Sequence, residues 1–442
     1  MKVMKFGGTS VGSPERMKSV AKLITESPEN KIVVLSAVSG TTNALVEITA
    51  AHKSGVDANA LINNLKEQYD KFCIELLQTE PYRNEAARII GEHFGRIQAI
   101  QTGPFSGTAE KEILAQGELI STRLFDLLLK ETGIAAKWIP ALSFMRLDEE
   151  GEPRIGYLNE ELTKIIRNNL ENQIFLTQGF ICRNHEGEID NLKRGGSDYT
   201  ASLIGAAINA TEVQIWTDID GMHNNDPRIV DRTFPIAELS FDEAAELAYF
   251  GAKILHPSSI LPAQKYNIPV RLLNTMAPEA HGTKIYARKK DGGSQIKAIA
   301  AKDGITAIKI KSSRMLLAYG FLRKVFEIFE RYKTPIDMIT TSEVALSVTV
   351  DDNTHVKAIE QELNYYGAVN VDHDLSIVCI VGDCVAEAHG VASQVIQALD
   401  DIPLRMISYG GSKNNISLLI ETSYKNRALQ CLNEQLFTFP EK

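Results

Sequence analysis

Apolar residues in the first 283 positions occur in two kinds of run. Short and nearly continuous runs predict buried strands, and these are Met1–Phe6, Lys31–Ala37, Ile174–Cys182 and Val213–Trp216. Between them apolar residues recur three and four positions apart, which predicts helices such as Thr108–Lys130. Strands that alternate with helices in this way predict an open, mainly parallel sheet with helices on both faces over residues 1–283.

The pattern changes after residues 284–295, which are poor in apolar residues and rich in Lys and Gly and therefore predict a linker. A round of strand, helix, strand, strand, helix and strand follows, and then a second round that ends on a helix. Both predict ferredoxin-like βαββαβ modules. We place the modules at residues 304–373 and 374–442. Within residues 284–303, Ile296–Ala300 predicts an extra strand, separate from Ile305–Ile310, that joins the sheet of the second module. Because such modules usually pair edge to edge, often between chains, we expect a homodimer.

Composition narrows the class of protein. A formal net charge of -9 and a hydrophobic content of 44% fit an acidic globular protein, and no basic face suited to nucleic acid is present. The five cysteines lack a metal-ligand spacing, which predicts free thiols in a reducing compartment and no metal site made by the protein itself. No signal-like core or membrane-length apolar run occurs, so we expect a cytoplasmic protein without a membrane partner.

Three polar turns that contain glycine accompany the predicted strands, at Gly7–Gly12, Ser36–Asn43 and Arg194–Thr200. Ligands collect at the carboxyl ends of parallel strands, so these turns predict one shared cleft. In the third turn, Gly195 and Gly196 permit a sharp bend, and Ser197 and Asp198 are suited to cap the helix that follows. The first turn lacks the lysine that a P-loop has after its last glycine, and Lys5 precedes it instead.

The charged residues near these turns suit phosphoryl transfer. Lys5, Arg194 and Lys253 can neutralise anionic oxygens, and the sequence has no Ser-His-Asp or Cys-His set. A carboxylate acceptor is ionised at neutral pH and needs no general base, so Asp198 would orient Lys5 or a magnesium-bound nucleotide. The plainer alternatives are an ordinary capped turn and solvated lysines.

Gly117 lies inside the predicted helix Thr108–Lys130, near its apolar stripe. A glycine there costs roughly 1 kcal/mol of helix stability relative to alanine, which suggests that another segment approaches closely. Glu118, at the edge of the stripe, would then face the cleft and hold a substrate ammonium group. A solvated surface glutamate is equally compatible with the spacing.

Five motifs in this order resemble the aspartokinase family: Lys5–Ser10, Gly117–Glu118, Arg194–Thr200, Trp216–Asp218 and Phe250–Pro257. The resemblance spans essentially the whole chain and implies the amino-acid kinase fold followed by two ACT modules. It also implies ATP-dependent phosphorylation of the side-chain carboxylate of L-aspartate to 4-phospho-L-aspartate. That reaction opens the route to lysine, threonine, methionine and diaminopimelate, and the ATP should carry Mg²⁺.

The same resemblance implies a role for individual residues. Lys5 would stabilise the transferring phosphoryl group, and Asp198 would organise the active-site cations. The substrate residues would be Thr42, Glu118, Arg194 and Ser197. The nucleotide residues would be Lys5, Gly7, Gly8, Thr217, Asp218, His223, Arg228 and Lys253. Relatives commonly have Tyr in place of His223, so this chain departs from the family pattern there.

In the first module, eight residues match the lysine-inhibited, single-function branch of the family: Met315, Phe321, Leu322, Ile336, Asp337, Thr341, Ser342 and Glu343. The resemblance implies L-lysine as inhibitor, with Asp337 and Glu343 receiving its cationic groups. The alternative is simple packing of the module, especially for Phe321 and Leu322. Ala318 replaces a hydroxyl found in some relatives, so lysine, threonine, both or neither remain open as effectors.

Two other functions compete with an aspartate kinase. A kinase of another small acid, such as acetylglutamate, is not expected to carry this pair of modules. An amino-acid-sensing protein with an inactive kinase half is disfavoured by the presence of Lys5, Arg194 and Asp198. No fused dehydrogenase is expected, because the sequence stops at Lys442.

Overall fold

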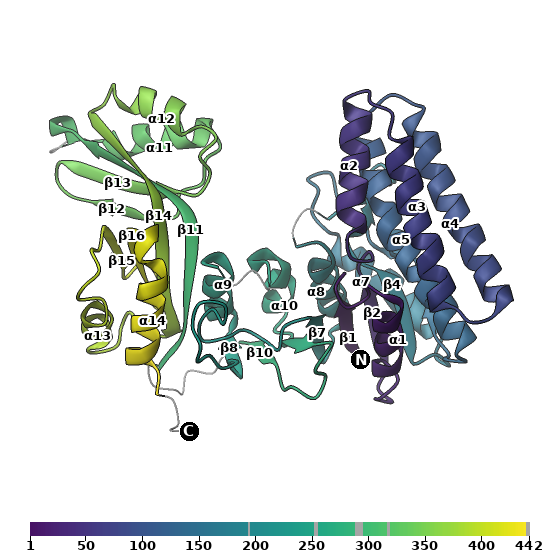
Figure 1. The fold of residues 1–442 in the computed structure, drawn as a ribbon. Helices are drawn as coiled ribbons and strands as arrows, with labels where there is room; N and C mark the ends of the chain where they lie inside the picture. Colours follow the sequence, from purple (N-terminus) through teal and green to yellow (C-terminus); the bar gives the residue numbers. More distant parts are fainter. Residues whose placement is uncertain (193–194, 252–254, 288–294, 316–318, 439–442) are drawn as a thin grey trace. The chain divides into compact units, whose positions relative to one another are not determined.

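The computed structural model describes residues 1–192, 195–251, 255–287, 295–315 and 319–438, and the chain forms two compact units. The first comprises Met1–Met222, Ala237–Phe241 and Ile254–Arg288. The second comprises His223–Ile236, Asp242–Lys253 and Lys289–Lys442. Each unit has its own sheet and its own helices (Figure 1).

The first unit is built on an eight-stranded sheet. From one edge to the other, its strands are β3 (Lys137–Trp138), β4 (Ile174–Gln178), β2 (Lys31–Leu35), β1 (Lys2–Phe6), β7 (Glu212–Thr217), β9 (Val270–Asn274), β10 (Thr283–Tyr286) and β8 (Glu238–Ser240). Only β9 and β10 are antiparallel neighbours, which confirms the mainly parallel sheet. On the central strand β1, Lys5 is paired with Val34 and Ile215.

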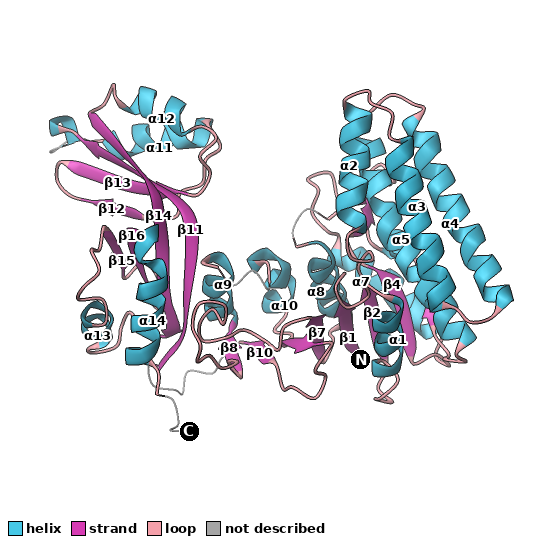
Figure 2. Ribbon diagram, in the orientation of Figure 1, coloured by secondary structure: helices cyan, strands magenta, loops and turns pink. Residues whose placement is uncertain are grey.

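The helices of the first unit include a bundle in which α2 to α5 lie side by side (Figure 2). The helices are α1 (Pro14–Leu23), α2 (Thr41–Lys53), α3 (Asn59–Leu76), α4 (Glu80–Gln101), α5 (Gly107–Glu131), α6 (Ala141–Phe144), α7 (Ile155–Arg167), α8 (Gly196–Ile208) and α10 (Leu261–Lys265), with a 3-10 turn at Pro257–Ile260. On α3 the buried residues Ile62, Leu65, Tyr69, Cys73 and Leu76 recur every three or four positions. This spacing gives the helix one apolar face, which packs into the bundle.

The sequence pattern predicts a single strand over Ile174–Cys182, and this prediction is wrong. β4 ends at Gln178, and Phe180 has a φ of 67°, which interrupts the extended backbone. The chain then forms a two-stranded hairpin of β5 (Ile181–Arg183) and β6 (Ile189–Asn191). The glycine turn before α8 therefore leaves this hairpin and not a strand of the main sheet.

The second unit is built on a six-stranded antiparallel sheet. In order, its strands are β12 (Ile339–Thr341), β13 (Ala345–Val350), β11 (Gln295–Lys311), β14 (Ala368–Asp383), β16 (Asn415–Glu421) and β15 (Met406–Tyr409). Its helices are α9 (Phe241–Tyr249), α11 (Phe321–Arg331), α12 (Val356–Leu363), α13 (Val391–Gln397) and α14 (Lys425–Leu436), with 3-10 turns at Ser313–Met315 and Thr422–Tyr424. The order of elements from β11 to β14 follows a βαββαβ round, and the second round runs from β14 to α14 and is completed by the first part of β11.

The two modules share their central strands. The segments predicted as separate strands, Ile296–Ala300 and Ile305–Ile310, are parts of the single strand β11. β11 pairs with β14 along its length, with an irregular register between Lys302 and Ile305. One continuous pair of strands therefore joins both halves of the sheet.

Segments from the middle of the sequence pack onto these modules. Residues 223–236 and most of α9 belong to the second unit. The side chain of Asn224 donates a hydrogen bond to Oδ1 of Asn433 on α14 at 3.1 Å. On α9, the carboxylate of Glu243 lies 2.7 Å from Nζ of Lys297 on β11. Buried polar contacts thus hold the first segment against α14 and the second against β11.

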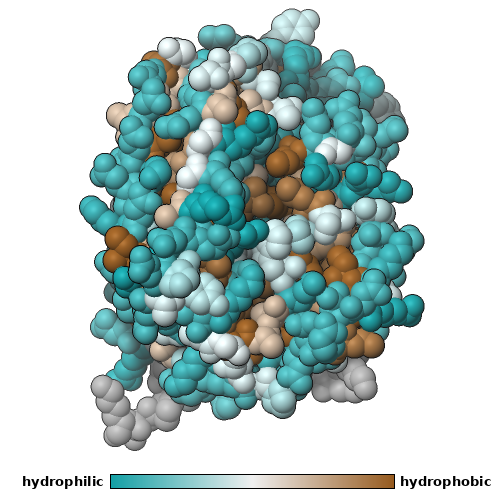
Figure 3. Space-filling view, turned by 90° about the vertical axis from the view of Figure 1, so that its right-hand side faces the viewer, coloured by the Kyte–Doolittle hydropathy of each residue, from teal (hydrophilic) through white to brown (hydrophobic). Residues whose placement is uncertain are grey.

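On the face drawn in Figure 3, hydrophilic side chains predominate and hydrophobic side chains gather in several smaller areas. In the first unit, exposed apolar side chains include Val56, Ile74 and Leu170. Scattered residues of this kind are normal on a folded protein. Among the described residues, no helix combines the length and the apolar composition needed to cross a bilayer.

Candidate active site

The site is built around the start of α8, where the third glycine turn lies. Gly195 is the N-cap residue and has a φ of 64°, in the left-handed region that glycine adopts readily. A Cβ atom on Gly195 would lie 2.5 Å from Cβ of Ser259, so a side chain does not fit there. The prediction that Ser197 and Asp198 cap this helix is wrong, because both lie inside its first turn. Their side chains bind partners on other elements instead.

Asp198 forms an ion pair with Lys5 of the central strand. Nζ of Lys5 lies 2.6 Å from Oδ1 of Asp198, and the two side chains are only 12% and 15% exposed. A Cβ atom on Gly7, just beyond β1, would lie 3.4 Å from this Nζ. The ammonium group therefore lies at a strand end beside backbone without side chains, a setting that suits an anionic oxygen.

The loop after β2 contacts both α8 and α5. Oγ of Ser36 donates a hydrogen bond to Oγ of Ser197 at 2.9 Å, and the carbonyl of Ser36 accepts one from Oγ of Ser121 at 2.7 Å. A Cβ atom on Gly8 would lie 3.2 Å from the carbonyl oxygen of Ala37, so the first two turns also touch. The three glycine turns thus lie together, as the sequence predicted. Ser36 was missed as a site residue, although its place directly after β2 was an available signal.

Glu118 on α5 faces the same loop and is buried. The backbone N–H of Ala37 donates a hydrogen bond to its Oε1 at 3.3 Å, and its Oε2 has no hydrogen-bond partner among the described residues. Burial raises the pKa of Glu118 to about 8, although the N–H of Ala37 and the charge of Lys5 act in the opposite direction. A Cβ atom on Gly117 would lie 2.8 Å from Cβ of Ala37, so the predicted close approach is confirmed. A buried carboxylate with one unpaired oxygen is suited to a cationic group.

Thr42 lies in the first turn of α2 and is exposed. Its neighbour Thr41 is buried, and its Oγ1 lies 2.8 Å from the hydroxyl oxygen of Tyr69. Burial raises the pKa of Tyr69, so the phenol stays protonated and keeps this bond at neutral pH. The hydrogen bond between Thr41 and Tyr69 fixes the first residue of α2, next to Thr42. Arg194, the other predicted substrate residue, lies outside the described residues.

The predicted nucleotide residues fall in both units. Thr217 ends β7, and its Oγ1 donates a hydrogen bond to Oδ1 of Asp218 at 3.1 Å. His223 and Arg228 lie in the segment of the second unit that packs onto α14, and the side chain of Arg228 is 85% exposed. Lys253 is outside the part of the chain that the structure describes.

The residues of the first unit fit a magnesium-bound nucleotide. Gly7 leaves the space beside the Lys5 ammonium group free of a side chain, and Asp198 supplies one carboxylate. Within the described residues, no group of three or more His, Cys, Asp or Glu side chains could hold a metal ion. A Mg²⁺ ion would accordingly be held mainly by nucleotide phosphates and water.

The predicted effector residues lie in the first module. Met315, Phe321 and Ile336 belong to its core or pack against it, and Leu322, Thr341, Ser342 and Glu343 are exposed. The side chain of Asp337 is 1% exposed and lies 3.0 Å from Nζ of Lys302. The side chain of Phe321 thus packs into the core, as the alternative interpretation expected, whereas Asp337 is a buried anion.

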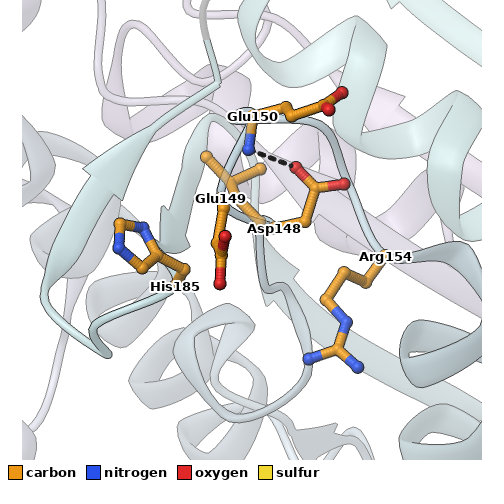
Figure 4. A pocket seen from close by; sticks show the side chains of 6 residues that line it. Asp148, Glu149, Glu150, Arg154 and His185 are labelled. Carbon is orange, nitrogen blue, oxygen red and sulfur yellow. Dashed lines mark hydrogen bonds between the residues drawn. The ribbon is translucent and has the colours of Figure 1, made fainter.

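A separate pocket of about 460 Å³ lies beside the β5–β6 hairpin, where His185 lines it (Figure 4). Its acidic side chains do not converge, because Glu149 and Glu150 point in different directions in Figure 4. Oδ1 of Asp148 accepts hydrogen bonds from the backbone of Glu150 and Glu152 and so closes its own turn. The pocket contains none of the predicted site residues.

Comparison with known proteins decides the family. The profile of the amino acid kinase family matches residues 1–274, and that of an ACT domain matches residues 378–436. Lysine-sensitive aspartokinase 3 of Escherichia coli (strain K12) is 34% identical over 452 residues, which cover 98% of this chain and 99% of that protein. The chain belongs to the aspartokinase family.

Solved aspartokinase structures agree in fold. The structure of E. coli aspartokinase III in complex with aspartate and ADP (R-state) has a TM-score of 0.83 and 32% identity, and the match covers 99% of this chain and all of that one. Its complex with lysine and aspartate (T-state) has a TM-score of 0.82 and 33% identity, with the same coverage. The predicted amino-acid kinase fold with ACT modules is therefore confirmed, and this aspartokinase is an aspartate kinase. The roles of its individual site residues remain predictions.

Proposed function

We propose that this aspartate kinase transfers the γ-phosphoryl group of ATP to the side-chain carboxylate of L-aspartate, which gives 4-phospho-L-aspartate. The arrangement of three residues supports the proposal. Lys5 and Asp198 form an ion pair at a strand end. The buried carboxyl group of Glu118 is close enough to Lys5 for the charge of that lysine to lower its pKa. The first pair suits a transferring phosphoryl group, and Glu118 suits a substrate ammonium group. A similar protein, E. coli aspartokinase III, was solved with aspartate and ADP.

Lys5 would act on the phosphoryl group. A carboxylate oxygen of the substrate forms the new bond to phosphorus, while the bond to the β-γ bridging oxygen breaks and ADP leaves. No proton has to be removed, because the carboxylate is already ionised. The side chain of Lys5 is only 12% exposed, so its ammonium group would stabilise charge on the phosphoryl oxygens better than a solvated amine would. Asp198 would hold that ammonium group in position.

Substrate selection would depend on the charges at both ends of aspartate. Its ammonium group would bind the unpaired Oε2 of Glu118, which would favour the ionised form of that side chain. Arg194 would bind the carboxylate next to the ammonium group, and Ser197 and Thr42 would contact the remaining polar edges. The side-chain carboxylate is then the group left to face the nucleotide.

ATP with Mg²⁺ is the proposed phosphoryl donor. The backbone of Gly7 and Gly8 would approach the phosphates together with Lys5. The other nucleotide contacts would come from Thr217, Asp218, His223, Arg228 and Lys253. When bound, Mg²⁺ neutralises phosphate charge and orients the phosphates.

L-Lysine is the proposed inhibitor, and its cationic groups would bind Asp337 and Glu343 in the first module. A similar protein is named lysine-sensitive, and its solved T-state contains lysine. We further propose a cytoplasmic homodimer joined through the ACT modules. The reaction would be the first step of lysine, threonine, methionine and diaminopimelate biosynthesis.

The test is formation of an acyl phosphate from ATP and Mg²⁺, trapped with hydroxylamine. L-Aspartate is compared with N-acetyl-L-glutamate, with and without L-lysine. Turnover of aspartate that lysine suppresses supports the whole proposal. Turnover that ignores lysine leaves the reaction standing and removes the effector, and preference for N-acetyl-L-glutamate would contradict the reaction.

A further inference from the structure

The carboxylate of Asp337 already binds a primary ammonium group of the chain itself. Nζ of Lys302, on β11, lies 3.0 Å from Oδ1 of Asp337 and 2.7 Å from Oδ2 of Asp351. The same Nζ lies 4.3 Å from the centre of the Tyr249 ring, and the Tyr249 hydroxyl donates a hydrogen bond to Oδ1 of Asp337 at 2.6 Å. One oxygen of Asp337 therefore receives both a cation and a hydroxyl group.

The carboxylate at the centre of this cluster is buried, whereas Tyr249 and Asp351 beside it are partly exposed. The side chain of Asp337 is 1% exposed and that of Lys302 is 19% exposed. Oδ2 of Asp337 is also buried, and the described part of the chain provides no hydrogen-bond partner for it. The backbone N–H of Asp337 donates to the carbonyl of Thr349 at 2.9 Å, which fixes the carboxylate on the module. A buried carboxylate that is half satisfied is suited to a further cation.

We propose that Lys302 is a tethered competitor of the effector: its ammonium group occupies Asp337 in the free enzyme and so sets the concentration of lysine needed for inhibition. The inference rests on the proposed assignment of Asp337 to the effector. The side chain of Lys302 and that of free lysine carry the same group, a primary alkylammonium. Whether the effector displaces Lys302 or binds the second oxygen beside it, the positive charge of Lys302 opposes its binding.

Asp351 modulates this competition. It shares the charge of Lys302 with Asp337, and its own side chain is 37% exposed. If Asp351 loses its charge, Asp337 is the remaining anionic partner of Lys302 in this cluster, and the ion pair between Lys302 and Asp337 should become stronger. The two substitutions Lys302→Met and Asp351→Asn should therefore change lysine sensitivity in opposite directions.

The experiment measures the lysine concentration for half-inhibition of full-length enzyme, scaled to the activity of each variant without lysine. Lys302→Met should lower it about tenfold, because the carboxylate loses its internal cation. Asp351→Asn should raise it. The matched control is Lys309→Met, since Lys309 is also on β11 and pairs with Asp372 at 2.8 Å, away from the cluster. This control should leave the value unchanged, and L-norleucine, which lacks the side-chain ammonium group, should not distinguish the variants.

Each outcome decides the inference. If lysine inhibits the wild type, and Lys302→Met leaves that sensitivity unchanged or weaker, the inference is wrong and the proposed function stands. If lysine affects neither protein while aspartate kinase activity persists, both the inference and the lysine assignment are wrong. If lysine inhibits Lys302→Met and not the wild type, the inference is supported, because Lys302 would exclude lysine completely in the wild-type enzyme. If Lys302→Met does not fold, the direction of the Asp351→Asn shift decides.

Discussion

The ammonium group of Lys5 lies 2.6 Å from a carboxylate oxygen of Asp198, where the end of the central strand meets the first turn of α8. Both side chains are mostly buried, so their charges act in a medium of lower dielectric constant than water. The proposed acceptor carboxylate is already ionised and has no proton to lose, so we expect the pair to place a positive charge and not to move a proton.

Replacing Lys5 with Met should lower kcat of the aspartate kinase reaction by about 10² to 10³, because one fixed charge that faces the transition state is lost. The matched control is Lys2→Met on the same strand, where the lysine pairs with Glu29 at 2.8 Å. Steady-state kinetics at saturating ATP separates kcat from KM. A change of KM alone in Lys5→Met would assign Lys5 to ground-state binding and contradict its proposed role.

The KM for aspartate should fall as the pH rises from 6.5 toward 8. Burial holds the pKa of Glu118 at about 8, so at lower pH the free side chain is protonated, and it must lose its proton to bind an ammonium group. Glu118→Gln should raise KM about tenfold or more and abolish this pH dependence. Glu110→Gln, exposed in the first turn of the same helix, is the control. A KM with the same pH profile in Glu118→Gln would exclude Glu118 as the ammonium ligand.

Glu118 should also make the folded protein less stable as the pH rises. Its pKa in the folded state, about 8, exceeds the value of 4.5 that it has without burial. The folded state therefore binds more protons than the unfolded state between these values, and the free energy of unfolding falls with pH across that window. Urea unfolding of the free enzyme at pH 5.5 and 8 measures this change. The free energy of unfolding should fall less between the two pH values in Glu118→Gln than in the wild type. Equal losses would mean that Glu118 is ionised throughout.

Gly195→Ala should lower the free energy of unfolding by at least 1 to 2 kcal/mol, which is roughly the cost of a left-handed conformation for alanine. The clash of its Cβ atom with Ser259 adds to this cost. Gly91→Ala in α4 is the control, because a Cβ atom there meets nothing within 4 Å, and the helix should gain roughly 0.5 to 1 kcal/mol. Chemical denaturation of both variants checks the opposite signs.

The pattern of the sequence predicted most of the fold because strand and helix periods are strong local signals. Lys5 and the turn after β2 could be placed together because neighbouring parallel strands end at the same edge of a sheet. The turn that carries Ser197 and Asp198 follows the β5–β6 hairpin instead, and it reaches the site because α8 packs against β1 and β2. The N-cap at Gly195 was missed, since a preference of Ser and Asp for caps is weaker than the backbone geometry that the Ser259 contact imposes. The break at Phe180 was equally hidden, because an apolar residue with positive φ gives no local signal.

Contacts between residues far apart in the sequence could not be predicted from the local pattern of apolar and polar residues. Nothing near α9 in the sequence indicates that Tyr249 binds Asp337, or that Asn224 binds Asn433 on α14. Such pairs depend on how distant elements pack, and each residue alone is compatible with a solvated surface. The ion pair of Lys302 with Asp337 belongs to the same class and became visible only in the folded protein.

The most direct measurement identifies which carboxylate of aspartate is phosphorylated. The product formed from L-aspartate, ATP and Mg²⁺ is reduced with borohydride, and the resulting amino alcohol is identified by mass spectrometry and chromatography. Phosphorylation of the side-chain carboxylate predicts homoserine, at a level that falls sharply in Lys5→Met. The isomer reduced at the other carboxylate, or no reducible product from folded enzyme, would contradict the proposed reaction.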